Sequence, residues 1–195
     1  MGKPGWGCIE PDQVKWFSEK NKELQEQEGR AVPSFVFFHI PPPEVLIAEK
    51  TSKGLREAVC CSSANSGAFD AFRQAGNVKL VAFGHDHKND YSALLGGIYM
   101  YYGRKTGYGG YGPSDPYERG ARVYLVHVGE DGEITWETTI RTESGKVVKS
   151  GEEKVLDEDL ALAEQTECAP YEFEVFGFST ESYLAMSAQK VKEDL

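Results

Sequence analysis

The stretch that most constrains this chain is Phe83-Gly84-His85-Asp86-His87, which follows a signal for a buried strand. Residues 78–83 form an apolar run of strand length, and Gly84 interrupts it. Two of the four histidines of the chain then stand two residues apart. A strand fixes the position of such a loop, while the loop leaves the imidazoles able to turn toward a cation. The stretch therefore predicts metal ligands at a sheet edge. Taken alone, His-x-His is equally compatible with a polar turn that holds no metal.

A second apolar run, residues 34–38, leads directly to His39. Three prolines follow at 41–43, and they cannot continue a sheet. The continuous apolarity of this run predicts a strand covered on both faces. Two strands that each end in a histidine at a sharp turn strengthen the metal interpretation, with neutral imidazoles suited to zinc, iron or manganese.

Composition excludes several partners. The 195 residues carry a formal net charge of −10, and no basic block is present, so we expect no nucleic-acid binding and no attraction to an anionic membrane. No apolar run reaches the length of a membrane span, and the first residues lack a signal-peptide pattern, so we expect a cytoplasmic location. The four cysteines include no Cys-x-x-Cys pair and predict reduced thiols.

The remaining patterns alternate between helix and strand, which indicates an α/β fold. Helices are predicted at 11–28 and 68–75, a helical turn at 44–49, an aromatic strand at 96–103, and a hairpin of 121–128 with 133–141 around Glu130-Asp131-Gly132. After residue 143 the signal fades, with a short helix at 155–162 and an aromatic strand at 170–178 as candidates.

Residues 103–118 form a loop rich in glycine and tyrosine. Arg104, Tyr108 and Tyr111 are candidates for substrate contacts there, and a flexible turn is the alternative. Asn89 and Asp90 are expected to hydrogen-bond the loop backbone.

These residues carry a resemblance. Phe37-Phe38-His39-Ile40-Pro41 and Phe83-Gly84-His85-Asp86-His87 resemble the last two signature motifs of the calcineurin-like metallophosphoesterases. With Gly109-Gly110-Tyr111-Gly112 and Arg119-Gly120-Ala121-Arg122-Val123, the chain is most similar to the purple-acid-phosphatase-like branch found in plants and fungi, over about residues 5–142.

The resemblance implies hydrolysis of phosphomonoesters by two divalent or trivalent metal ions (iron, zinc or manganese). His39 and His85 would bind one metal, and His87 would bind the other. The fold it implies is the C-terminal half of the metallophosphoesterase α/β sandwich, with a mixed β-sheet, flanking helices and a β-hairpin region after the Gly-His-x-His loop. Residues 1–143 would form this part, and 144–195 an acidic C-terminal extension.

The chain departs from the family in one large respect. The Asp-x-His, Gly-Asp-x-x-Asp and Gly-Asn-His motifs, which would supply the bridging carboxylate and other ligands, do not occur in it. We therefore expect a truncated or separately encoded half, with no assigned catalytic residue and little activity alone. Its partners would be a phosphorylated substrate and the missing N-terminal half, or another chain that covers exposed sheet.

Two other functions remain open. One is a catalytically degenerate phosphatase-like module with a binding or regulatory role. The other is a mononuclear zinc protein that uses the same three histidines.

Overall fold

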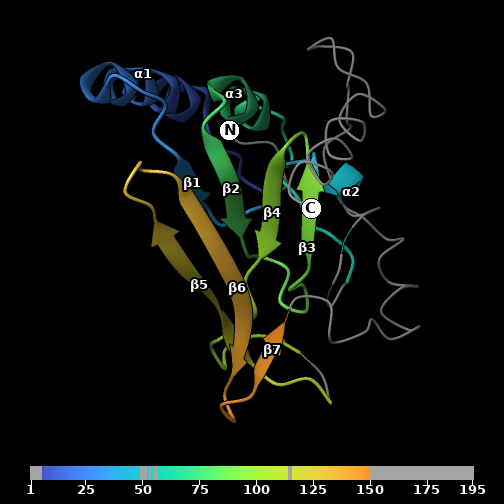
Figure 1. The fold of residues 1–195 in the computed structure, drawn as a ribbon. Helices are drawn as coiled ribbons and strands as arrows, with labels where there is room; N and C mark the ends of the chain where they lie inside the picture. The colour runs from blue at the N-terminus through green and yellow to red at the C-terminus, as the bar shows by residue number, and fades with distance from the viewer. Residues whose placement is uncertain (1–5, 49–51, 53, 55–56, 114–115, 150–195) are drawn as a thin grey trace.

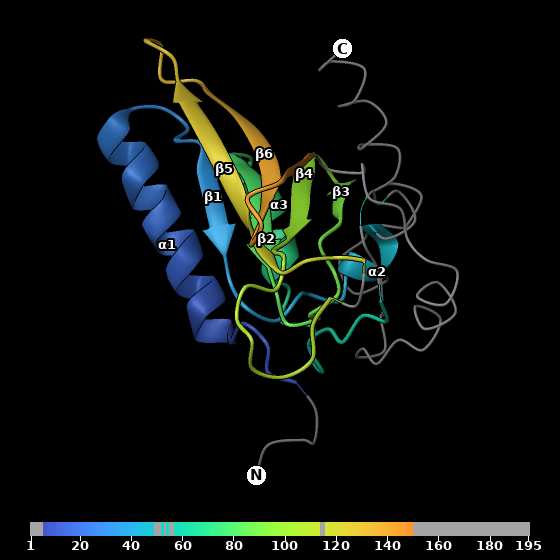
Figure 2. The same ribbon diagram turned by 90° about the horizontal axis from the view of Figure 1, so that it is seen from below.

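The computed structural model describes residues 6–48, 52, 54, 57–113 and 116–149, which form two β-sheets with flanking helices. Figures 1 and 2 show the helices α1 and α3 on one side of the molecule and the strands β5, β6 and β7 on the other. The helices are α1 (Pro11–Glu28), α2 (Val45–Ala48) and α3 (Ala68–Ala75). The strands are β1 (Ser34–Phe37), β2 (Val78–Phe83), β3 (Ser92–Leu95), β4 (Ile98–Tyr102), β5 (Gly120–Val128), β6 (Ile134–Thr142) and β7 (Val147–Lys149).

Helix α1 begins and ends where its sequence predicts. Pro11 stands at its first position, and Glu10 and Gln13 form a reciprocal capping box. Gly29 ends the helix in a left-handed conformation, with φ of 66°. No residue of α1 is buried, although Val14 and Phe17 pack partly against the core. The helix therefore contacts the core through a few partly buried side chains and is otherwise exposed.

The first sheet has the strand order β1-β2-β4-β3. Strands β1, β2 and β4 run parallel, and β3 pairs antiparallel with β4. The tight turn between β3 and β4 contains Gly96 and Gly97, both with positive φ. The parallel direction of β1 and β2 matters for function, because it brings the carboxyl ends of these two strands to the same edge.

Aromatic contacts join the layers on both faces of this sheet. On the helix side, Phe72 of α3 packs against Phe17 of α1 and against Phe38. On the other side lies the antiparallel sheet β5-β6-β7, where Trp136 contacts Phe35 at 5.3 Å and Tyr124 contacts Tyr101 at 5.7 Å between ring centroids. The prediction of an α/β fold with a mixed sheet and flanking helices is confirmed at this level.

Two expectations differ from the structure, and two strands have no counterpart among the predicted elements. Strand β1 is not covered on both faces: its residues are half-buried and Phe37 is 62% exposed, because β1 is an edge strand. Cys61 is disulfide-bonded, so the prediction of reduced thiols is wrong for that residue, whereas Cys8 and Cys60 carry reduced thiols. Strands β3 and β7 were not predicted.

The predicted segments 155–162 and 170–178 lie outside the described residues. Strand β7 lies just beyond the predicted domain boundary at residue 143 and pairs with β6. None of the helices in the described part of the chain has the length and apolarity needed to cross a membrane.

Candidate functional site

Two histidines meet at the carboxyl edge of the first sheet. His39 follows β1 and His85 follows β2, each two residues after the last residue of its strand. The parallel pairing continues past the strand ends, since the Gly84 amide donates to the carbonyl of His39 at 3.0 Å. The two imidazole rings lie 5.3 Å apart between centroids, at an angle of 85°. The topology thus brings together two residues that stand 46 positions apart in the sequence.

His85 has an unusual backbone conformation. Its φ is 80°, and among the described residues it is the one non-glycine residue with positive φ. Such a conformation costs on the order of 1 kcal/mol and persists only where the surroundings hold it. The ring of Trp6 packs edge-on against the His85 ring at 4.4 Å, and Trp6 is itself held by two hydrogen bonds with Ser63. The strained backbone conformation thus occurs at His85, one of the predicted metal ligands.

A buried carboxylate holds the loop between the two loop histidines. Asp86 is 3% exposed, and its carboxylate accepts hydrogen bonds from the Tyr102 hydroxyl at 2.6 Å and from the Cys60 amide at 3.1 Å. Burial raises the pKa of Asp86 to about 6, and the bond from Tyr102 opposes that shift. Asp86 is therefore engaged in fixing the loop, which leaves His85 and His87 on either side of it.

His87 is oriented by Tyr111 of the Gly/Tyr loop. Its Nδ1 lies 2.7 Å from the carbonyl oxygen of Tyr111, its amide donates to the Tyr111 hydroxyl at 3.1 Å, and the two rings stack at 4.4 Å. A carbonyl can only accept, so Nδ1 is the donor, and in the neutral form of the imidazole Nε2 keeps its lone pair. Metal-binding histidines are typically fixed in this way. Glu57 completes the arrangement by accepting from the Tyr111 hydroxyl and from the Lys88 amide.

The protonation state of His85 also suits a ligand. Burial lowers the pKa of His85, and the neighbouring His39 and His87 lower it further. A lowered pKa keeps the imidazole neutral near pH 7, which is the form that binds a metal ion.

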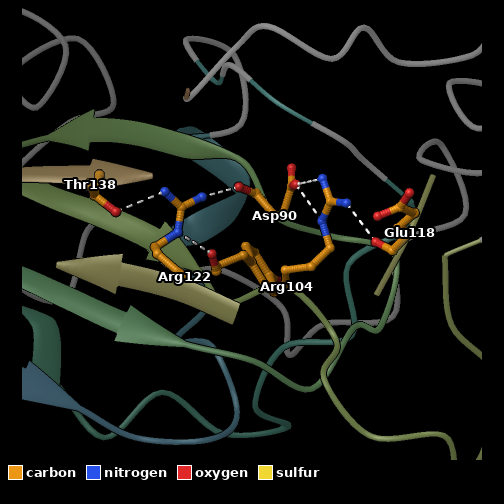
Figure 3. A network of polar contacts seen from close by, with 6 residues as sticks. Asp90, Arg104, Glu118, Arg122 and Thr138 are labelled. Atoms are coloured by element: carbon orange, nitrogen blue, oxygen red, sulfur yellow. Dashed lines mark hydrogen bonds and ion pairs between the residues drawn. The ribbon is translucent and has the colours of Figure 1, made fainter. Parts of the chain in front are cut away.

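Arg104 lies in a buried network rather than at an open surface (Figure 3). Its Nε donates to the Asp90 carboxylate at 2.8 Å, a second nitrogen contacts the same oxygen, and Nη1 donates to the carbonyl of Glu118 at 2.7 Å. Arg122 donates to the carbonyls of Asp90 and Tyr102 and to the Thr138 hydroxyl. This network connects the histidine loop to the loop after β4 and to the hairpin. The contacts of Arg104 therefore indicate that it holds the loop in position.

The two tyrosines predicted at the site differ in their surroundings. Tyr111 touches His87 directly, as described above. Tyr108 is 77% exposed, donates to the Glu143 carboxylate at 3.0 Å and lies under the guanidinium of Arg119. Of these two tyrosines, Tyr111 is the one that contacts a histidine. His127 is exposed on β5, away from the other three histidines in the sequence.

The residues present are suitable donors but too few for the two-metal centre that the resemblance implies. The part of the chain that the structure describes contains no group of three or more histidine, cysteine, aspartate or glutamate side chains that could hold a metal ion. The two carboxylates of the loop, Asp86 and Asp90, are engaged by Tyr102 and Arg104. A cation at this edge would meet imidazoles without a bridging carboxylate.

Sequence reasoning missed the residues that hold the histidines in place. Trp6, Glu57 and Tyr102 contact the loop from distant positions, and no local pattern marks them as its partners. The only available signal was the polar composition of the loop itself.

Among the curated relatives of this chain are proteins named as purple acid phosphatases. "Probable inactive purple acid phosphatase 29" of Arabidopsis thaliana is 37% identical over 143 residues, which are 68% of this chain and 36% of that protein. "Probable inactive purple acid phosphatase 14" of the same plant is 31% identical over 168 residues, or 85% of this chain and 41% of the relative. "Phosphatase DCR2" of Saccharomyces cerevisiae is 32% identical over 147 residues, which are 68% of this chain and 25% of that protein.

The chain therefore spans between a quarter and about two fifths of the length of these relatives. No protein-family model matches it, and no solved structure does. The similarity confirms that the chain is related to the purple-acid-phosphatase-like branch, as its motifs predicted.

Proposed function

We propose that this chain, a relative of purple-acid-phosphatase-like proteins, supplies the histidine part of a metal-dependent phosphomonoesterase site and is poorly active alone. The observation that carries the proposal is the meeting of His39 and His85 at one sheet edge. The remaining ligands, including a carboxylate that bridges two metals, would come from polypeptide outside this chain. The chain would then correspond to the C-terminal half of the phosphoesterase fold, formed by residues 1–143 and followed by the extension 144–195.

The three histidines have distinct assignments in this proposal. His39 and His85 would hold one metal, because their rings already lie side by side. His87 would hold the other through Nε2, because Tyr111 occupies its Nδ1. Iron, zinc and manganese all accept imidazole ligands, and the donors present do not distinguish among them.

Substrate contacts are assigned to the Gly/Tyr loop. Tyr111 is the strongest candidate, since its exposed ring stacks on His87. Tyr108, on the same loop, is available at the surface. Arg104 stays a prediction as a substrate contact, and its buried pairing with Asp90 favours a role in holding the loop.

A binding or regulatory module without catalysis is the second candidate. Two observations favour it: the names of two of the Arabidopsis relatives include the word "inactive", and both loop carboxylates are engaged within the protein. The cytoplasmic location also stays a prediction, and the disulfide at Cys61 weighs against it because structural disulfides persist mainly in oxidising compartments.

The test uses single histidine substitutions in the purified chain. Zinc affinity is measured by competition with a chromogenic chelator, and turnover is measured with para-nitrophenyl phosphate in the presence of zinc, iron or manganese. We expect weak zinc binding that falls about tenfold or more in His39→Ala and His85→Ala, with turnover near background. The exposed His127→Ala is the matched control and should bind zinc as the parent does. Robust turnover by the chain alone, or equal affinity in all variants, would overturn the proposal.

A further inference from the structure

Arg119 lies across the Gly/Tyr loop, immediately before β5. Its Nη1 donates to the carbonyl of Gly107 at 2.5 Å, and its Cζ lies 5.6 Å from the centroid of the Tyr108 ring. The guanidinium also lies against Gly112, where an added Cβ atom would stand 2.7 Å from Cζ. A carbonyl and an aromatic face thus hold the planar guanidinium in one orientation.

The charge of Arg119 is not neutralised within the described part of the chain. None of the described carboxylates forms an ion pair with it. Glu118 precedes it in the sequence but accepts from the Ser144 hydroxyl. Glu143, whose amide donates to the Arg119 carbonyl, accepts from the Tyr108 hydroxyl. In a chain with a net charge of −10, a fixed cation of this kind is a local attraction for anions.

The loop that Arg119 crosses also contacts a candidate metal ligand. Tyr111 stacks on the His87 ring, and an added Cβ atom at Gly110 would stand 3.4 Å from Cε1 of His87. Gly110 is two residues from Gly112, which the guanidinium covers. Because two residues of extended chain span about 7 Å, the guanidinium lies no more than about 13 Å from the His87 ring.

The other arginines of this region have different surroundings. Arg104 is 4% exposed and donates to the Asp90 carboxylate, and Arg122 donates to two carbonyls and a hydroxyl. Arg119 is only half-buried, and the carbonyl of Gly107 is the one hydrogen-bond acceptor that its guanidinium meets among the described residues. Its remaining nitrogens can therefore donate to a bound ligand.

We propose that Arg119 binds a second anionic group, a carboxylate or a phosphate, on the phosphomonoester that the histidine edge receives. The inference rests on the proposed function, in which metals held by the histidines bind the phosphate that is hydrolysed. The planar fork of a guanidinium matches both kinds of anion. Tyr111 separates Arg119 from His87 along the loop, so the two groups would meet different parts of one substrate.

The substrate class follows from this arrangement. A phosphomonoester whose remaining part is neutral would lack the second contact, whereas one with a further carboxylate or phosphate would gain it. The gain matters more on an acidic protein, because the net charge of −10 repels anions elsewhere on the surface. Arg104, which the composition of the loop suggested for substrate contact, is paired with Asp90, and Arg119 takes that role.

The test compares two probes that differ in one group: hexyl phosphate, and 6-carboxyhexyl phosphate with a carboxylate at the free end of the chain. Isothermal titration calorimetry measures their affinities for the full chain in the presence of zinc. We expect the parent to bind the carboxylate probe about fivefold more tightly, the gain from one ion pair between partly exposed groups. Arg119→Gln should abolish this preference and leave the affinity for hexyl phosphate unchanged.

Arg30→Gln is the matched control. The guanidinium of Arg30 covers Gly132 as that of Arg119 covers Gly112, with Cζ 2.7 Å from an added Cβ atom, and it donates to the Gly132 carbonyl at 3.4 Å. Arg30 precedes β1, at the opposite end of that strand from His39. The substitution should leave both affinities unchanged.

Two further measurements separate binding from a role in holding the loop. Arg119→Lys keeps the charge without the planar fork and should retain part of the preference for the carboxylate probe. The nitrogen spectrum of the His87 ring reports its tautomer, which Tyr111 fixes, and it should be the same in Arg119→Gln as in the parent.

His85→Ala separates this inference from the proposed function, since it should weaken both probes equally. If His85→Ala binds both probes as the parent does while Arg119→Gln still removes the preference, the anion contact stands and the metal assignment fails. Three results would overturn the inference: a parent that does not favour the carboxylate probe, an equal loss for both probes in Arg119→Gln, and loss of the preference in Arg30→Gln.

Discussion

The histidine loop and the outer edge of β1 stand close together in the fold but are completed in opposite ways. The loop is held by the chain itself: Asp86 and Asp90 are buried, and Tyr102, Arg104 and Arg122 bind them. Among the described strands, none pairs with the outer edge of β1, and Phe37 of this strand is 62% exposed. The contrast shows that the described chain fixes its histidine loop with its own side chains, whereas the outer side of β1 stays partly exposed. Substitutions in the loop should therefore cost stability in the isolated chain, and substitutions at the edge should not.

The largest effect is expected from Arg104→Met, which leaves the buried Asp90 carboxylate without its cation. Breaking a buried ion pair by removing one partner costs about 3–5 kcal/mol in free energy of unfolding. Urea denaturation followed by circular dichroism measures the loss. The exposed pair of Lys20 and Glu23 provides the control, since Glu23→Gln should cost less than about 1 kcal/mol. Equal costs at the two sites would show that the loop network does not hold the fold.

A pH-dependent loss of stability is expected from Glu44, which begins the turn into α2. Its side chain is 1% exposed, Asn65 donates to one oxygen, and the other oxygen has no hydrogen-bond partner among the described residues. Burial raises the pKa of Glu44 from 4.5 to about 7. A raised carboxyl pKa means that folding favours the protonated form, so stability falls as the pH rises from about 4.5 through 7.

The size of this loss is up to about 3 kcal/mol between these pH values. Glu44→Gln keeps the acceptor for Asn65 and should be more stable than the parent at pH 8, with little difference at pH 4. Thermal unfolding across this range, with the exposed Glu26→Gln as control, provides the measurement. A parent protein that gains stability on going from pH 5 to pH 8 relative to Glu44→Gln would contradict the assignment.

Sequence reasoning recovered the parts of the fold that have local signals. Pro11 and Gly29 mark the ends of α1, and Gly84 marks the end of β2 before the histidines. It failed where the answer depends on a distant neighbour. The apolar run of β1 resembles a central strand, but its exposure depends on whether a second neighbour is present, which the run itself cannot reveal.

The site shows the same limit. The ligand candidates were visible as His39, His85 and His87, because a histidine after a strand is a local pattern. The partner of Arg104 is Asp90, 14 residues away, and no spacing rule for loops indicates such a pair. Loop residues selected as substrate contacts on composition alone can thus be buried structural residues.

A smaller effect is expected from Tyr102→Phe, which removes the hydroxyl that donates to Asp86. Leaving a buried carboxylate with one hydrogen bond fewer should cost about 2 kcal/mol, and it should raise the pKa of Asp86 further. Chemical denaturation at pH 7 measures the cost. Tyr101→Phe is the comparison, since that hydroxyl accepts a neutral hydrogen bond from the indole of Trp136 at 3.2 Å and its loss should cost less. A smaller cost for Tyr102→Phe than for Tyr101→Phe would argue against Asp86 as the anchor of the loop.

The smallest effect is expected at the open edge. Phe37→Ser should change the stability of the isolated chain by less than about 1 kcal/mol, because the side chain is already 62% exposed. Urea denaturation of the chain alone is the measurement. A cost as large as that of Arg104→Met would mean that the edge is part of the completed core, and the contrast between the two regions would fail.

The number of tightly bound metal ions tests the central claim most directly. Equilibrium dialysis against zinc, followed by elemental analysis, compares the chain alone with its mixture with the unmatched part of the Arabidopsis relative. We predict less than one tightly bound zinc ion per chain when the chain is alone and two when it is mixed with the unmatched part of the relative. The substitution His85→Ala should lower the number of bound zinc ions in both samples. Two zinc ions held tightly by the isolated chain would contradict the account, because the described histidines would then suffice without an added carboxylate.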